Sequence, residues 1–220
     1  MKRLGLNQTP YEYIKKHEDK YIYVHKNFDE EILELNEICE KIANNLKYPM
    51  FVKPSNSGSS VGINKAKNIG ELKEAIEHAG LFDNKILIEQ GIDGKEIECA
   101  VLGNEEVVAS GVGEIKSAEE FYTYNAKYKN QESKTKIPAE ISEEKAEEVR
   151  KAAIKAFKAI DGKGLSRVDF FVEKGTEKIY INEINTLPGF TNISMYPKLF
   201  EEKGLKYSEL LDRLIELAKK

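Results

Sequence analysis

Several features that mark particular classes of protein are scarce in this chain of 220 residues. The two cysteines, Cys39 and Cys99, fall in a predicted helix and a predicted strand, so we expect buried thiols in a reducing compartment rather than a disulfide. No apolar run approaches the roughly 18 residues needed to span a bilayer. The N-terminus carries no apolar signal segment. These scarcities together predict a cytoplasmic protein.

Other absences limit the binding partners and the types of reaction that we expect of this chain. Charged residues make up 33% of the chain but the net charge is only -4, with both signs interspersed. A nucleic-acid or anionic-membrane partner would call for a basic face, so neither is expected. The histidines His17, His25 and His78 do not have the spacing of metal ligands. No motif for a serine or cysteine nucleophile is present, which argues against covalent catalysis.

What the sequence does contain is a mixture of helical and strand periodicity. Apolar residues at helical spacing predict four helices, whose first residues follow the caps Asp29, Asn68, Ser142 and Ser208. Short apolar runs predict strands at 50–53, 85–89, 96–102, 106–110, 168–172 and 178–184. Since the strands run together and helices flank them, the sequence predicts an α+β fold with antiparallel sheets.

Oxygen-bearing side chains cluster on the last two predicted strands. Glu183 and Asn185 are two residues apart, so they project from one face of their strand. If the strand containing Asp169 pairs with it, the three side chains form a hard-oxygen site suited to magnesium bridging phosphates. Arg167 points the same way as Asp169 and brings a positive charge beside the metal. The alternative is that Glu183 is only a polar residue at a strand end.

A loop of small residues at 55–62 follows the predicted strand that ends near Lys53. Small side chains let backbone N–H groups approach phosphate oxygens, and the lysine adds a mobile positive charge. The loop is not the G-x-x-x-x-G-K-[ST] motif, because no lysine follows its second glycine. It therefore indicates either a phosphate-binding loop or an ordinary turn.

Two further segments allow a functional and an ordinary interpretation. Glu89 and Glu96 flank a predicted hinge at 90–95, where a carboxylate could accept hydrogen bonds from ribose hydroxyls or simply be solvated. The stretch 113–137 has no clear periodicity but is rich in aromatic residues, and a loop of that length is uncommon unless it is functional or disordered. Within it, Lys127 and Tyr128 could belong to a closing lid or to a charged surface.

Five separated motifs agree in order and spacing with one family. They are Lys53-Pro-Ser-Asn-Ser-Gly-Ser-Ser-Val-Gly62, Glu89 with Glu96, Phe121-Tyr-x-Tyr-x-Ala-Lys-Tyr128, Ser166-Arg-Val-Asp169 and Asn182-Glu-Ile-Asn-Thr-Leu-Pro-Gly-Phe-Thr-Asn-Ile-Ser-Met-Tyr-Pro197. In these motifs the chain resembles the D-alanine–D-alanine ligases of the ATP-grasp superfamily. The resemblance implies an ATP-grasp fold, with ATP held between two small α+β domains at 1–96 and 97–220.

The resemblance also assigns a task to each motif residue. ATP would be bound by Lys53, Gly58, Ser60, Val61, Glu89, Gln90, Ile92, Glu96 and Lys127. Two magnesium ions, or manganese, would be held by Asp169, Glu183 and Asn185. Catalysis would involve Arg167 and the backbone of Gly189 at the oxyanion, with Ser59 and Tyr128 ordering the closed site. The second D-alanine would be recognised by Lys127, Ser194 and Met195.

The activity implied is ATP-dependent formation of D-alanyl-D-alanine through an acyl phosphate, for peptidoglycan and hence for the cell wall and cell shape. Tyr128 matches the dipeptide-forming members rather than those with histidine there, which favour D-lactate. A D-serine or D-lactate acceptor, another ATP-grasp carboxylate–amine ligase and a nucleotide-binding module without turnover remain alternatives.

One departure from the family pattern concerns the start of the chain. In the family a further domain precedes this region and carries the site of the first D-alanine. The resemblance therefore implies the central and C-terminal domains alone, with little turnover by themselves. The partners implied are ATP, D-alanine, the N-terminal domain of the same enzyme and, in a homodimer, a second copy.

Overall fold

A computed structural model describes the chain except for residues 59–60, 117–133 and 220. The described residues divide into two compact units, each built on one antiparallel sheet. The first, which we call the Lys53 unit, is Thr9–Ile92. The second, the Asp169 unit, comprises Met1–Gln8, Asp93–Lys116 and the chain from Lys134 onward. The predicted α+β class with antiparallel sheets is confirmed, whereas the domain boundary at residue 96 stays a prediction.

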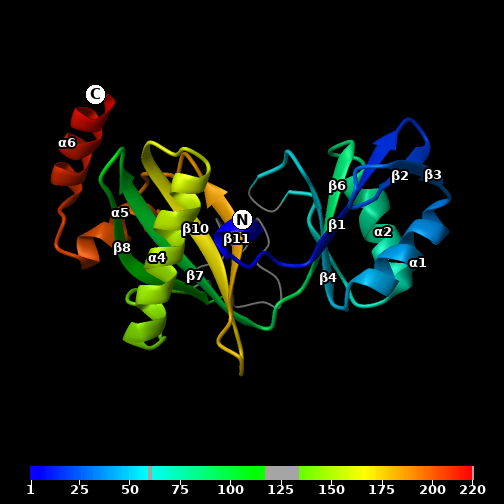
Figure 1. The fold of residues 1–220 in the computed structure, drawn as a ribbon, viewed down its shortest axis with the longest axis horizontal. Helices are drawn as coiled ribbons and strands as arrows, with labels where there is room; N and C mark the ends of the chain where they lie inside the picture. Colours follow the sequence, from blue (N-terminus) through cyan, green and yellow to red (C-terminus); the bar gives the residue numbers. More distant parts are fainter. Residues whose placement is uncertain (59–60, 117–133, 220) are drawn as a thin grey trace. The chain divides into compact units, whose positions relative to one another are not determined.

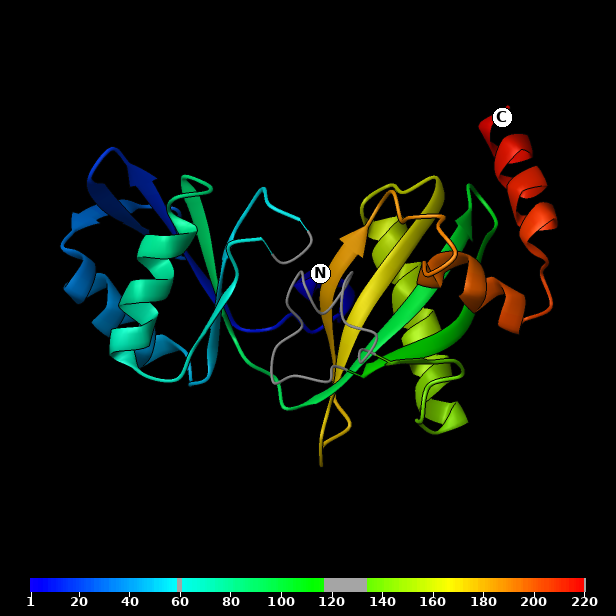
Figure 2. The same ribbon diagram turned by 180° about the vertical axis from the view of Figure 1, so that it is seen from behind.

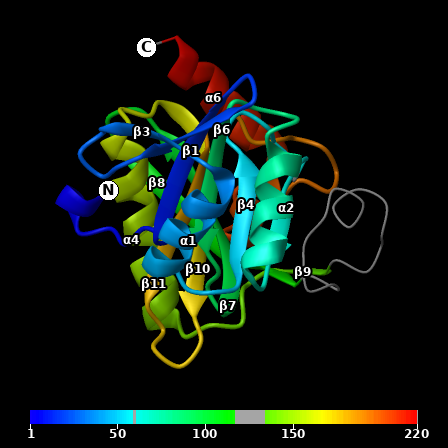
Figure 3. The same cartoon turned by 90° about the vertical axis from the view of Figure 1, so that its right-hand side faces the viewer.

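The Lys53 unit is a six-stranded sheet with two helices on one face. Its strand order is β3 (Glu30–Leu33), β2 (Lys20–Val24), β1 (Tyr11–His17), β6 (Lys85–Gln90), β4 (Met50–Pro54) and β5 (Asn64–Ala66). Figure 3 shows α1 (Leu35–Asn45) and α2 (Ile69–Ala79) in front of β1, β4 and β6. Val52 is buried in the core beneath these helices, so its neighbour Lys53 projects from the opposite face.

The Asp169 unit has a five-stranded sheet with helices on both faces. Its strand order is β11 (Ile179–Asn185), β10 (Gly164–Glu173), β7 (Gly94–Gly103), β8 (Val107–Lys116) and β9 (Lys134–Lys136). Its helices are α4 (Glu143–Ala159), α5 (Met195–Glu202) and α6 (Tyr207–Ala218), and a short 3-10 helix spans Lys2–Leu4.

Successive residues of β8 show which helix packs on each face of this sheet. Val112 packs in the core with α4 residues such as Phe157. A Cβ atom at Gly111 or Gly113 would instead collide with side chains of α5. Figure 1 shows α4 in front of β7 and β10, and Figure 2, the view from behind, shows α5 on the other face. The face that carries α5 is also the one that carries Asp169, because Val168 and Phe170 belong to the α4 core.

Two of the four predicted helix starts are confirmed. The Asn68 side chain accepts a hydrogen bond from the Glu71 N–H, and the Ser142 side chain accepts one from the Lys145 N–H. Each therefore satisfies a backbone donor that the helix itself leaves unpaired. The predicted strands at 50–53 and 85–89 are confirmed as β4 and β6.

The other two helix starts are wrong. Glu30–Leu33, expected inside the first helix, pairs with β2, and the helix begins only after Glu34, which forms a capping box with Glu37. The last helix begins at Tyr207 after Lys206, not after Ser208. The capping signal at Asp29 was misleading because residues 30–33 pair with β2 instead of forming a helix. A preference that comes from a partner strand cannot be seen in the local sequence.

Some elements were not predicted at all. The strands β1 and β2 carry many lysines and tyrosines, which blur their alternation. The helix α5 was hidden by Pro197, but this proline lies in the first turn, where a missing N–H costs little. Within the described residues, no helix is both long and apolar enough to cross a membrane.

The Asn68 cap gives a direct test of this fold. Asn68→Ala removes the acceptor for the Glu71 N–H, so we expect the free energy of unfolding to fall by about 1 kcal/mol in urea titrations. Asn36→Ala, at an exposed position of α1, is the matched control and should change stability by less than about 0.5 kcal/mol. Equal effects of the two substitutions would contradict the capping role.

Candidate functional site

A row of acidic residues crosses three neighbouring strands of the Asp169 unit. Asp169 on β10 lies directly opposite Glu183 on β11 and opposite Glu98 on β7. Arg167, two residues before Asp169, lies opposite Asn185. Positions opposite each other in a sheet share a face. The pairing of β10 with β11 therefore brings together the three predicted metal ligands and Arg167, one of the two predicted oxyanion groups.

Arg167 is tied to this row by short contacts. Its Nε donates to Asp169 Oδ1 at 2.8 Å and its Nη2 donates to Asp169 Oδ2 at 2.7 Å. Glu98 Oε1 lies 3.3 Å from the same Nε, and Glu183 Oε1 lies 4.0 Å from Nη2. Burial alone would lower the pKa of Arg167, but the hydrogen bonds and negative charges of these carboxylates outweigh it and raise the pKa. The guanidinium is thus a fixed positive charge.

Glu98 is the member of this row that sequence reasoning missed. Its side chain is only 7% exposed, in the middle of the sheet. A sequence signal for Glu98 was nevertheless present. Polar and apolar residues alternate along this strand, in the order Glu96, Ile97, Glu98 and Cys99. That alternation places Glu98 on the same face as the predicted ribose ligand Glu96.

The donor set fits a hard divalent cation. Asp169, Glu183 and Asn185 offer two carboxylates and an amide oxygen, which are ligands that magnesium prefers. Both oxygens of Asp169 accept bonds from Arg167, yet each oxygen has a further lone pair. In the described part of the chain, no three His, Cys, Asp or Glu side chains gather closely enough to hold a metal. Glu98 is a partner of Arg167 in the structure.

The predicted acceptor residues lie in and after the loop that follows β11. The Ser194 hydroxyl accepts a hydrogen bond from the Thr191 N–H at 2.9 Å, and a Cβ atom on Gly189 would lie 2.9 Å from that hydroxyl oxygen. Met195 is buried, and its Cε reaches within 2.4 Å of where a Cβ atom on Gly113 would stand. Gly113 lies opposite Glu98, so Met195 lies over the strand next to the acidic row.

In the Lys53 unit, Lys53 and Glu89 contact each other. Lys53 Nζ lies 2.5 Å from Glu89 Oε2, and their side chains are 22% and 16% exposed. Both project from the sheet face that α1 and α2 leave uncovered. The sequence assigned these residues to different parts of ATP, and the structure pairs them as an ion pair.

Asp83 fixes the start of the 55–62 loop and was not predicted. Its Oδ2 accepts from the Asn56 N–H at 2.7 Å and its Oδ1 accepts from the Lys85 N–H at 3.2 Å. Burial alone would raise the pKa of Asp83, but these backbone donors outweigh it and lower the pKa. Its carboxylate thus joins the loop to β6.

The far end of the loop depends on a glycine. Gly62 has φ of +74°, and a Cβ atom there would lie 2.8 Å from the Phe82 ring and 2.9 Å from Pro54. Among the predicted loop ligands, Gly58 has open space around its Cα and Val61 is 39% exposed. Exposed backbone at both positions is compatible with a phosphate-binding loop.

The predicted hinge residues are placed in different units. Gln90 uses its side-chain oxygen to accept from the Lys47 N–H at 3.0 Å and its own N–H to bond Pro10. Gln90 and Ile92 belong to the Lys53 unit, whereas Glu96 lies on β7.

Four predicted site residues lie outside the described part of the chain, namely Ser59, Ser60, Lys127 and Tyr128.

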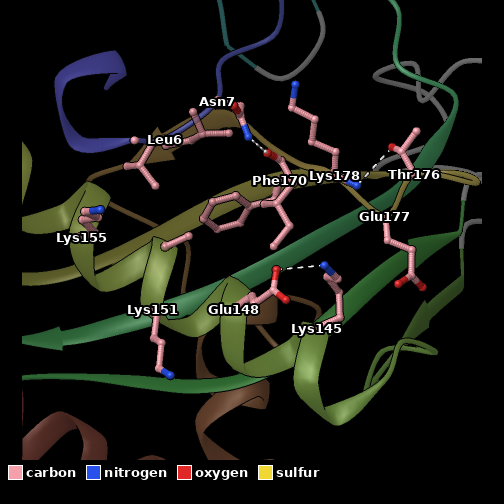
Figure 4. Close-up of a pocket in the computed structure, with 14 residues that line it drawn as sticks. Leu6, Asn7, Lys145, Glu148, Lys151, Lys155, Phe170, Thr176, Glu177 and Lys178 are labelled. Carbon is pink, nitrogen blue, oxygen red and sulfur yellow. Dashed lines mark hydrogen bonds and ion pairs between the residues drawn. The ribbon is translucent and has the colours of Figure 1, made fainter.

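A pocket of about 620 Å³ occurs on the other face of the Asp169 unit. Figure 4 shows Phe170 between Leu6 and Asn7 on one side and Lys145 and Lys151 of α4 on the other. Lys145 is paired with Glu148 at 2.8 Å. Phe170 follows Asp169 but points to the α4 side, so this pocket does not include the acidic row.

Both cysteines are buried and free, as predicted. Burial raises the pKa of the Cys99 thiol to about 12 and that of Cys39 to about 11. Neither thiol is therefore a nucleophile near neutral pH, which agrees with the absence of a nucleophile motif.

Comparison with known proteins places this arrangement in a class and then in a family. Two antiparallel α+β units with this topology are shared with solved ligases of ATP-grasp fold. The family described as "D-ala D-ala ligase C-terminus" matches residues 1–216. The chain belongs to this family.

Individual relatives agree with that membership. The D-alanine--D-alanine ligase of Acetivibrio thermocellus is 59% identical over 82% of this chain and 48% of its own length. That of Clostridium novyi is 48% identical over 99% of this chain and 60% of its own length. The chain thus spans about half the length of the curated relatives it matches.

Solved structures extend the comparison to the fold. The VanG D-Ala:D-Ser ligase from Enterococcus faecalis matches with a TM-score of 0.81 and 36% identity, over 98% of this chain and 58% of that one. The D-alanine-D-alanine ligase from Coxiella burnetii matches with a TM-score of 0.79 and 33% identity, over 99% of this chain and 53% of that one.

The role of Asp83 predicts a particular pH dependence. Because its pKa is lower in the folded than in the unfolded state, where it is about 3.9, its contribution to stability is present above about pH 4 and is lost as the pH falls through the folded-state value. Asp83→Asn should therefore be less stable than the wild type in urea at pH 7, and the difference should shrink at pH 3. Asp19→Asn, at an exposed turn of the same unit, should unfold like the wild type at pH 7. A difference for Asp83→Asn that is equal at both pH values would contradict the assignment.

Proposed function

We propose that this chain carries the ATP- and metal-binding parts of an ATP-dependent ligase that joins two D-alanines. The observation that carries the proposal is the register of β10 and β11, which puts Arg167 and Asp169 opposite Asn185 and Glu183. Membership of the family supports it. The product would be D-alanyl-D-alanine for peptidoglycan, which would make the enzyme part of cytoplasmic cell-wall synthesis.

The chemistry requires positioning more than protein nucleophiles. The carboxylate of the first D-alanine attacks the γ-phosphorus of ATP, forming an acyl phosphate and releasing ADP. The amine of the second D-alanine then attacks the acyl carbon, and phosphate leaves as the peptide bond forms. Holding reactants in this geometry can contribute about 7–11 kcal/mol to lowering the barrier.

The residues that would bind ATP are those assigned from the sequence. In the proposal Lys53 exchanges its contact with Glu89 for phosphate oxygens, while backbone groups at Gly58, Ser60 and Val61 bind the phosphates. Glu89, Gln90 and Ile92 would face the adenine, Glu96 the ribose, and Lys127 the phosphates. Because Lys53 is paired in the structure, ATP binding must break a short ion pair.

Asp169, Glu183 and Asn185 would hold magnesium, as two ions, or manganese. A bound cation of this kind neutralises phosphate charge and orients the phosphoryl group. Arg167, with the backbone N–H of Gly189, would stabilise the negative charge that develops on the acyl carbon's oxygen. Ser59 and Tyr128 would help order the closed site that keeps the acyl phosphate from water.

Ser194 and Met195, together with Lys127, would recognise the acceptor. Two contacts support this proposal: Met195 lies over Gly113, which is opposite Glu98, and the Ser194 hydroxyl is bonded within the loop that follows β11. D-Serine is the second candidate acceptor, because one of the similar structures is described as a D-Ala:D-Ser ligase. A first D-alanine and, in a homodimer, a second copy of the chain would be the further partners.

The experiment that tests the proposal measures nucleotide binding to this chain. Lys53→Ala should weaken magnesium-ATP binding at least tenfold in calorimetry, which corresponds to about 1.4 kcal/mol. Lys85→Ala is the matched control, since this exposed lysine of the adjacent strand lies over the Tyr13 ring and is not one of the proposed ATP ligands. It should leave the affinity within about twofold, by the usual size of surface effects. Equal affinities for wild type and Lys53→Ala, with unchanged circular dichroism, would rule the proposed loop site out.

A further inference from the structure

Glu98 takes no part in the function proposed so far, although it is one of few buried acids in the described part of the Asp169 unit. It lies on the central strand β7, between Gly113 of β8 and Asp169 of β10. A buried carboxylate is costly unless charged or hydrogen-bonding groups compensate it. Arg167 is one compensating group, since its Nε lies 3.3 Å from Glu98 Oε1.

The same Nε therefore has two carboxylates within reach. Asp169 holds it with a 2.8 Å hydrogen bond as part of a two-pronged contact, while Glu98 is slightly farther and interacts as an ion pair. Only a small shift of the guanidinium would move its Nε from one acceptor to the other. The geometry thus provides Arg167 with a second acceptor on a neighbouring strand.

A second acceptor for the Arg167 Nε–H matters because Asp169 has two partners. In the function proposed above, which this inference rests on, Asp169 also binds a divalent cation. A cation on that carboxylate repels the guanidinium, because both groups are positively charged. The two hydrogen bonds from Arg167 to Asp169 would then weaken. This would happen at the stage when Arg167 has to stabilise the oxyanion.

We propose that Glu98 is a positioning residue that holds Arg167 in place when Asp169 is taken by the cation. Its acceptor oxygen lies on the side of Arg167 away from β11, where the other ligands Glu183 and Asn185 are found. Shifting toward Glu98 moves the guanidinium away from the cation but keeps it on the same sheet face.

A purely structural role makes a different prediction. If Glu98 only balanced charge in the fold, its loss would lower stability and would affect Arg167 equally with and without the cation. If it is the second acceptor, its loss has little effect while Asp169 holds Arg167, and a large effect once Asp169 is occupied. Cation dependence is therefore the property to measure.

The Arg167 Nε–H can be observed directly by ¹H–¹⁵N NMR, with the signal assigned by its absence in Arg167→Ala. In the wild type we expect slow exchange with solvent both without ligand and with MgCl₂ and a non-hydrolysable ATP analogue. In Glu98→Gln the exchange should match the wild type without ligand and become at least tenfold faster with it. Glu114→Gln, another buried glutamate of the sheet that pairs with Lys95 instead, is the matched control and should behave like the wild type.

A metal-free arm separates this inference from the proposed function. In Asp169→Asn, Glu98 should keep the Arg167 Nε–H in slow exchange, and the double variant Asp169→Asn/Glu98→Gln should lose that protection while keeping its circular dichroism. Equal exchange in the single and double variants, or an unchanged signal in ligand-bound Glu98→Gln, would overturn the role of Glu98. If calorimetry showed that the wild type does not bind the magnesium–nucleotide probe, the proposed function would fail, and the metal-free arm would still decide whether Glu98 holds Arg167.

Discussion

The two-pronged contact between Arg167 and Asp169 is the interaction on which the Asp169 unit depends. Charged groups in the middle of a sheet are unfavourable unless they compensate one another, and here the partners are two residues apart on one strand. Pairing of β10 with β7 and β11 adds Glu98 and Glu183 on either side. The sheet therefore gathers the charges that a phosphoryl-transfer site needs while its other face packs against α4.

Glycines allow the surrounding elements to approach these charges. Gly113 lets α5 lie against β8, so that Met195 reaches the strand next to Glu98, and Gly62 lets the backbone approach Pro54 and Phe82. In the Lys53 unit, Asp83 and the Lys53–Glu89 ion pair hold the loop and the lysine before any ligand binds. Each unit thus holds its own binding groups in place through its own contacts.

The sequence predicted the parts of this arrangement that follow from local chemistry. Alternation along single strands placed Arg167 with Asp169 and Glu183 with Asn185, and side-chain caps at Asn68 and Ser142 predicted two helix starts. It could not predict that Glu30–Leu33 pairs with β2, because that preference comes from a partner strand. Asp83 was missed for the same reason, since its contacts with Asn56 and Lys85 depend on folding, whereas the alternation that places Glu98 beside Glu96 on one face was present in the sequence.

The central claim is that Asp169 and Glu183 share a divalent cation on the face that carries Arg167. The most direct measurement is a crystal structure of this chain with MnCl₂ and a non-hydrolysable ATP analogue, using the anomalous signal of manganese. The account predicts an anomalous peak within about 2.0–2.4 Å of oxygens from both residues, as is usual for hard cations of this size. A bound nucleotide whose manganese lies away from both carboxylates, with Asp169 still bonded only to Arg167, would contradict it.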